Sequence, residues 1–230
     1  MTSFRASRQE HFPSPGKCLC VMQSCYLAQE TPTLDVTSFE QTFRKFDATI
    51  IGGNSDEERM EHRGVTYEHL QDTIERTFVA ARHCSSVVLA VMASGNREQV
   101  STPAGAVAIG DIVEKVNEYT QKGQTVPTVL FIHTTQASPS CEVGRLDLDP
   151  NRLNSNLLVV TAHRSATQPN GFESGFYGSR SIYKFCQRLA AEDSVLECAT
   201  KVNQEARNGD SVSIFENGFQ DFWLGQRVLV

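Results

Sequence analysis

SVVLAVMA, residues 86–93, and TVLFI, residues 128–132, are the two stretches that decide the fold of this chain. Each run is apolar without alternation and has the length of a strand, which indicates a strand buried on both faces of a sheet. Between them, segment 108–121 has Ile112, Val116 and Tyr119 at helical spacing. This order predicts two parallel strands joined by a crossover helix.

The same alternation of apolar runs and helical patterns continues on both sides of this unit. Apolar runs predict further strands at 18–22, 48–51 and 157–161 and a last one at 222–230, and helical spacing predicts helices at about 37–46, 66–82, 179–191 and 194–207. Segment 94–107 is expected to be a loop. Residues 1–15 are polar and include two prolines, so we expect them to be disordered. The pattern therefore predicts an α/β fold, with a mostly parallel sheet of about six strands flanked by helices on both faces.

The composition is that of a soluble globular protein, with 230 residues, 40% hydrophobic and 21% charged. A net charge of −6 argues against nucleic-acid and anionic-membrane partners, since both require clustered Lys and Arg. No apolar run is long enough to span a bilayer, and the N-terminal residues show no signal-peptide pattern. We therefore expect the seven cysteines to be free thiols in a cytoplasmic protein.

The spacing of Cys18, Cys20 and Cys25 could suggest a metal site. The first two lie in an apolar strand, however, and no matching pair follows, whereas zinc sites ordinarily combine two paired clusters. We expect no metal and no other cofactor. His163 is expected to lie at a strand end, exposed to solvent.

In a parallel sheet, functional residues follow the carboxyl ends of the strands. Ala93-Ser94-Gly95 follows the first of the two deciding runs, and His-Thr-Thr-Gln-Ala, residues 133–137, follows the second. This order and spacing resembles the caspase family over nearly the whole chain, from about residue 17 to the end. In that family one strand ends in Ser-His-Gly and a strand about 50 residues on ends in Gln-Ala-Cys-Arg-Gly. Ser94 thus stands at the position of the catalytic histidine and Thr135 at that of the catalytic cysteine.

The resemblance implies that both catalytic residues have been lost. The hydroxyl of Ser94 cannot accept and return a proton near neutral pH as an imidazole does, and the hydroxyl of Thr135 is a poor nucleophile without a neighbouring base. In that family a glutamine and an arginine bind the carboxylate of the substrate aspartate. His133 stands at the position of this glutamine and Glu173 at that of this arginine, where the Glu173 carboxylate would repel the substrate aspartate. We therefore expect a pseudoenzyme of this cysteine-type endopeptidase family.

The resemblance also divides residues 16–230, the caspase-like domain, into a large-subunit-like part (16–137), a linker (138–156) and a small-subunit-like part (157–230). The linker offers only Asp147 and Asp149 to a caspase-type cut, and Pro150 disfavours cutting after Asp149, so we expect an uncleaved linker. The last strand resembles the edge strand through which caspases dimerise. Its apolar residues are the predicted dimer interface: Phe222, Trp223, Leu224, Val228 and Leu229.

The expected function is regulation of apoptosis by heterodimerisation with an active caspase. We expect this chain to activate its partner caspase rather than inhibit it, because the fold and the edge strand look intact. Three alternatives stay open: a decoy inhibitor, a scaffold without a caspase partner, and a hydrolase in which Thr135 is the nucleophile and His133, two residues away, the base. A homodimer through the same edge is also compatible with the sequence.

Overall fold

The computed structural model describes residues 18–25, 33–52, 67–102, 104–122, 126–136, 146–164, 179–190, 194–206, 210–222 and 224, and these have an α/β fold. Their strands are β1 (Cys18–Cys25), β2 (Thr49–Gly52), β3 (Ser86–Ser94), β4 (Gln99–Thr102), β5 (Gly105–Ala108), β6 (Thr128–Thr135), β7 (Leu157–Arg164) and β8 (Asp210–Phe215). The α-helices are α1 (Thr33–Lys45), α3 (Tyr67–Ala80), α4 (Ile109–Gln121), α5 (Arg180–Ala190) and α6 (Val195–Glu205). Two short 3-10 helices are η1 (Ala81–His83) and η2 (Pro150–Arg152).

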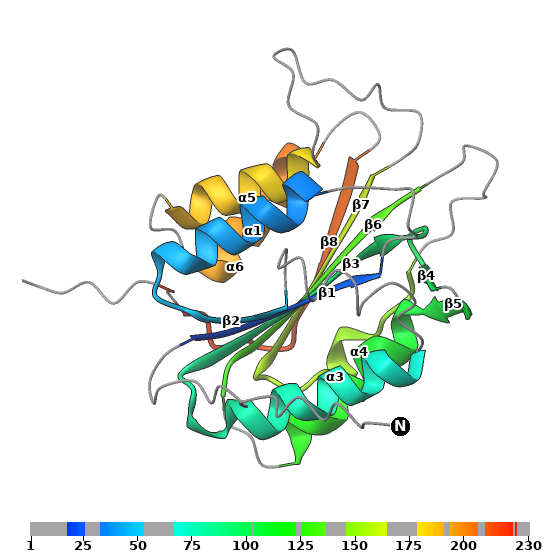
Figure 1. The fold of residues 1–230 in the computed structure, drawn as a ribbon, viewed down its shortest axis with the longest axis vertical. Helices are drawn as coiled ribbons and strands as arrows, with labels where there is room; N and C mark the ends of the chain where they lie inside the picture. The colour runs from blue at the N-terminus through cyan, green and yellow to red at the C-terminus, as the bar shows by residue number, and fades with distance from the viewer. Residues whose placement is uncertain are drawn as a thin grey trace, which may run out of the picture.

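Six of these strands form one twisted sheet in the order β2-β1-β3-β6-β7-β8 (Figure 1). All neighbours pair in parallel except β7 and β8, which are antiparallel. The predicted six-stranded, mostly parallel sheet is therefore confirmed. Because the strands that pair in parallel point the same way, the ends of β3, β6 and β7 meet at one edge of the sheet.

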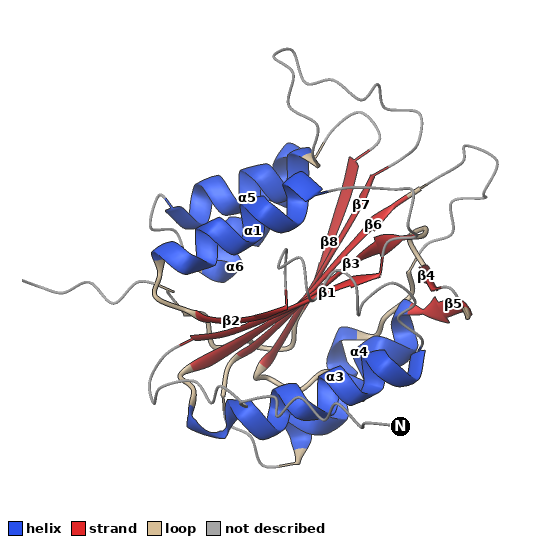
Figure 2. Ribbon diagram, in the orientation of Figure 1, coloured by secondary structure: helices blue, strands red, loops and turns tan. Residues whose placement is uncertain are grey.

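Helices cover both faces of the sheet, as predicted: α1, α5 and α6 lie on one face, and α3 and α4 on the other (Figure 2). Alternate residues of each central strand therefore enter one of two apolar cores, which explains why β3 is buried along its whole length and shows no polar alternation. The core under α1 and α5 contains a cluster of stacked and tilted aromatic rings, made of Phe39, Phe43, Phe131 and Phe185.

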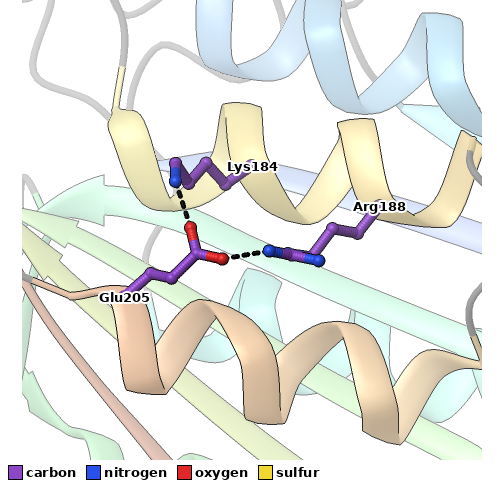
Figure 3. Close-up of polar contacts among 3 residues, drawn as sticks. All are labelled: Lys184, Arg188 and Glu205. Carbon is purple, nitrogen blue, oxygen red and sulfur yellow. Dashed lines mark hydrogen bonds and ion pairs between the residues drawn. The ribbon is translucent and has the colours of Figure 1, made fainter.

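An ion-pair network ties α5 to α6 on the outside of this layer. The carboxylate of Glu205, at the end of α6, accepts hydrogen bonds from both Lys184 and Arg188 of α5 (Figure 3). The hydrogen bond from Lys184 is the main reason why the pKa of Glu205 lies below its ordinary value. Because all three side chains are in contact with solvent, we expect the network to contribute little to stability, about 1 kcal/mol or less per pair.

Two elements differ from the sequence prediction. Segment 94–107, predicted as a loop, contains the antiparallel hairpin β4–β5. The prediction of a last strand at 222–230 is wrong for the described part of that range, because Phe222 and Leu224 are not in a strand. The strand at the sheet edge is β8, and Phe219 and Phe222, which follow it, pack against the core on the α6 side.

Candidate functional site

The two positions at which the resemblance places the catalytic residues lie side by side at the carboxyl edge of the sheet. Ser94 ends β3 and Thr135 ends β6, and the parallel register pairs them directly. Thr135 is in turn paired with Arg164, the last residue of β7. Since β-strand side chains alternate between faces, all three lie on the face covered by α1, α5 and α6. Ser94 is buried and Thr135 half-buried.

His133 lies two residues before Thr135 and therefore on the same face of β6. It is fully buried. Burial, and then the positive charges of His163 and Arg164, lower the pKa of His133 to about 3. Its imidazole is therefore neutral at pH 7 and a weak base, which argues against its activating the Thr135 hydroxyl.

A polar group that sequence reasoning missed lies on the opposite face. The hydroxyl of Thr134 donates to the carbonyl of Asn96 at 2.9 Å and lies 3.0 Å from Nδ1 of His163. Because the single hydroxyl proton points to the carbonyl, Nδ1 of His163 must carry the proton of the second bond. The expectation that His163 is solvated was wrong, since its side chain is buried beneath this contact.

His163 is the second histidine of this edge whose basicity is suppressed. Burial, and then the charge of Arg97, lower its pKa to about 4. Thr134 is buried and its proton is already donated, so the Thr134–His163 pair is a structural link between β6, β7 and the loop after β3 rather than an exposed nucleophile and base.

The loop that follows Ser94 is a tight turn with no room for a side chain at Gly95. The Gly95 N–H donates to the carbonyl of Thr135 at 2.9 Å, and the side chain of Asn96 accepts the N–H groups of Glu98 and Gln99, both at 2.8 Å. A Cβ at Gly95 would lie 2.2 Å from the carbonyl oxygen of Gln99. Glycine is therefore required where the chain leaves the candidate site.

We expect Gly95→Ala to lower the free energy of unfolding by about 1 to 3 kcal/mol, because the backbone of the turn must move to admit the methyl group. The matched control is Gly110→Ala in α4, where the added Cβ meets nothing within 4 Å and should stabilise the helix by about 0.5 to 1 kcal/mol. Urea denaturation of both variants measures the difference. Equal effects of the two substitutions would contradict the close contact at Gly95.

Several predicted site residues fall outside the described part of the chain. Glu173, Trp223, Val228 and Leu229 lie there, so their predicted roles stay predictions. Phe222 and Leu224 are described, and both are partly buried against the core on the α6 side. This placement corrects the expectation that they belong to an edge strand, while leaving their role in an interface untested.

No metal centre is found among the residues that the structure describes, since no three His, Cys, Asp or Glu side chains converge. Cys18 and Cys20 are buried in the core, and burial raises the pKa of the Cys18 thiol to about 12. A buried thiol of this kind stays protonated and behaves as a small apolar residue. No helix in the described ranges is long and apolar enough to cross a bilayer.

Comparison with known proteins finds similarity at the level of structure alone. No family model matches this sequence, and no curated protein matches it. Among solved structures, the chain is similar to one described as "structure of pro-sf-caspase-1", with a TM-score of 0.58 and 12% sequence identity over 90% of this chain and 93% of that chain. The chain therefore has a caspase-like fold. Identity this low carries the fold and not the activity.

Proposed function

We propose that this chain is a catalytically inactive caspase homologue that regulates apoptosis by heterodimerising in the cytoplasm with an active caspase and modulating it. The observation that carries the proposal is the direct pairing of Ser94 with Thr135 at the carboxyl edge of a caspase-like sheet. At these two positions the resemblance requires an imidazole and a thiol. Two hydroxyl groups cannot perform the family's proton transfer and nucleophilic attack.

The environment of these hydroxyls supports inactivity over a rewired hydrolase. A threonine nucleophile requires a base within hydrogen-bond reach whose pKa lies near the working pH. His133, the candidate base on the same strand face, has its pKa lowered to about 3. The other buried histidine, His163, lies on the opposite face and is bonded to Thr134.

The partner-facing edge in this proposal is β8 rather than residues 222–230. β8 pairs with β7 on one side, and the described part of the chain places no strand on its other side. An unpaired strand edge offers its backbone N–H and C=O groups to a strand of another chain. In the caspase family the dimer forms by pairing of the strands at this edge, so the same contact would join this chain to a catalytic partner or to a second copy.

The end of the linker supports the proposal that the chain stays in one piece. The Asp149 side chain accepts the N–H of Asn151 at the start of η2, so a cut after Asp149 requires this turn to open. Asn117 of α4 donates to the carbonyl of Arg152 at 2.9 Å and accepts the N–H of Asn154 at 2.8 Å. These contacts hold the residues around η2 against α4 and hinder binding in an extended form to a protease.

The decisive experiment titrates the purified chain into a catalytic caspase from the same source and measures cleavage of an aspartate-containing peptide. We expect the chain alone to cleave nothing, and the mixture to be more active than the caspase alone, because binding would favour the partner's active state. A less active mixture would identify the decoy inhibitor instead.

Thr135→Ala is the matched control, because an inactive regulator should act equally well without this hydroxyl. Turnover by the chain alone that disappears in Thr135→Ala would replace the pseudoenzyme with a threonine hydrolase. If neither the activity nor the hydrodynamic size of the mixture changes, the heterodimer proposal is wrong for that caspase.

A further inference from the structure

Residues 216–222, called the C-terminal strap, connect the end of β8 to the amino end of α6. The strap contains no helix or strand. The carboxylate of Glu216 accepts the N–H of Phe219 at 2.9 Å, and the amide of Asn217 donates to the carbonyl of Leu153, after η2, at 3.0 Å. The strap therefore crosses from the sheet to the helix layer as a folded segment.

The last residues of the strap cap the amino end of α6. The first N–H groups of a helix have no partner within the helix, and at α6 two of them are bound by the strap. Val195 donates its N–H to the carbonyl of Phe222 at 3.0 Å, and Leu196 donates to the Asp221 carboxylate at 2.9 Å. The same carboxylate accepts the hydroxyl of Ser194, the N-cap residue of α6, and the N–H of Phe222 at 2.8 Å.

Two aromatic rings are held in place by this closure. Phe219 is 8% exposed and belongs to the core beneath α6, and Phe222 is partly buried against the same core, with its ring centroid 6.2 Å from that of Phe219. The carboxylate of Asp221 lies between them in sequence and places its negative charge at the positive end of the α6 dipole. Asp221 therefore joins the polar contacts at the helix end to the segment that carries both rings.

We propose that the strap is a latch: Asp221 locks it onto the amino end of α6, and it opens as a unit while β8 stays paired in the sheet. The difference in attachment is the reason. β8 is held along six register pairs with β7, whereas the strap is held to the rest of the chain by separate contacts of the Asp221 carboxylate, the Phe222 carbonyl, the Asn217 amide and two rings. Segments held by such separate contacts open locally at lower free energy than strands paired along their length in a sheet.

Opening the latch has a specific consequence for recognition. It removes Phe219 and Phe222 from the chain's own core and frees the amino end of α6, so that an apolar segment becomes available to a partner. Phe222 is only partly buried when the latch is closed, and opening exposes the rest of its ring to a partner. If Phe222 contributes to the heterodimer proposed above, on which this last step rests, the open latch offers its whole ring to the partner.

Hydrogen–deuterium exchange on the whole chain tests the latch without any partner. We expect Asp221→Ala to raise the exchange rates of the Leu196 and Phe222 amides roughly tenfold or more, because a charge-assisted acceptor is lost, with β8 exchange unchanged. The matched control is Glu197→Ala. It removes the bond from the Ser194 N–H to Glu197 at the same helix end and leaves the strap's contacts in place.

Three outcomes would overturn the latch: Asp221→Ala leaves strap exchange unchanged, Glu197→Ala accelerates the strap equally, or β8 opens together with the strap. Asp221→Asn keeps an acceptor oxygen and should give an intermediate rate, and this variant decides the matter if Asp221→Ala does not fold. The caspase titration separates the two proposals. A wild-type chain without effect rejects the proposed function, whereas the exchange data still decide the latch. If the wild-type chain is effective, an unchanged response to Asp221→Asn rejects the link to Phe222.

Discussion

Lowering the pH from 7 to 5 is expected to reduce the free energy of unfolding by about 4 kcal/mol, through two buried histidines. Their pKa values in the folded chain are about 3 for His133 and about 4 for His163, against about 6.5 for an unperturbed histidine. Between these limits the unfolded chain binds more protons than the folded one. The stability is therefore complete above about pH 6.5 and falls as the pH drops toward the folded pKa values, by about 2 kcal/mol per histidine at pH 5.

The surroundings of both histidines explain why protonation is disfavoured. Burial is the main cause at both sites, because it disfavours the charged imidazole. The positive charge of Arg97 adds to the effect at His163, and the charges of His163 and Arg164 add to it at His133. Glu205 does not contribute in this window. Its pKa is lowered by its ion pairs, so the stability that it provides is present above the ordinary carboxyl pKa and is lost only at more acidic pH.

Urea denaturation at pH 7 and pH 5 measures the effect, and two variants assign it. His163→Gln and His133→Gln should each remove about half of the difference between the two pH values, because glutamine does not titrate. His83→Gln, on the exposed turn η1, controls for the loss of a histidine and should keep the full difference. A pH dependence that survives in both buried-site variants would show that other groups cause it.

The sheet was predictable from the sequence because its central strands are buried on both faces. Such strands are continuously apolar, as in 86–93 and 128–132, and the short length of these runs and their β-branched residues favour a strand over a buried helix. β8 was missed for the opposite reason. In its sequence, DSVSIF, serines alternate with Val212 and Ile214, as expected for a strand with one face in the core. The more apolar segment 222–230 resembles a strand in sequence, whereas Phe222 and Leu224 of that segment pack against the core on the α6 side.

Only the residues of the candidate site that directly follow apolar runs could be predicted from the sequence. Ser94 and Thr135 follow apolar runs, so both could be assigned to one edge, and their direct pairing agrees with that assignment. The Thr134–His163 bond depends on the register between β6 and β7 and on the fold of the loop that carries Asn96. Neither is encoded in a local pattern. The cap that Asp221 supplies to α6 likewise joins residues 25 positions apart in the chain.

Replacing Phe39 by alanine is expected to lower the free energy of unfolding by about 3 to 5 kcal/mol. Phe39 is fully buried on α1, with its ring centroid 4.8 Å from that of Phe43, 5.2 Å from that of Phe131 and 6.1 Å from that of Phe185. Its ring thus joins α1 to β6 and α5. Truncation leaves a cavity among three rings fixed on separate elements, so the core can collapse only in part.

Phe39→Leu and Val79→Ala make this prediction specific to the cavity. Leucine refills much of the volume and should cost about 1 to 1.5 kcal/mol, although it loses the ring contacts. Val79 is 49% exposed on α3, so its truncation should change stability by less than about 0.5 kcal/mol. If Phe39→Ala proved as mild as Val79→Ala in urea denaturation, α1 would not be packed on the sheet through this ring. The same β6 carries Phe131 in this cluster and Thr135 at its end, so the aromatic core also fixes the strand on which the candidate site depends.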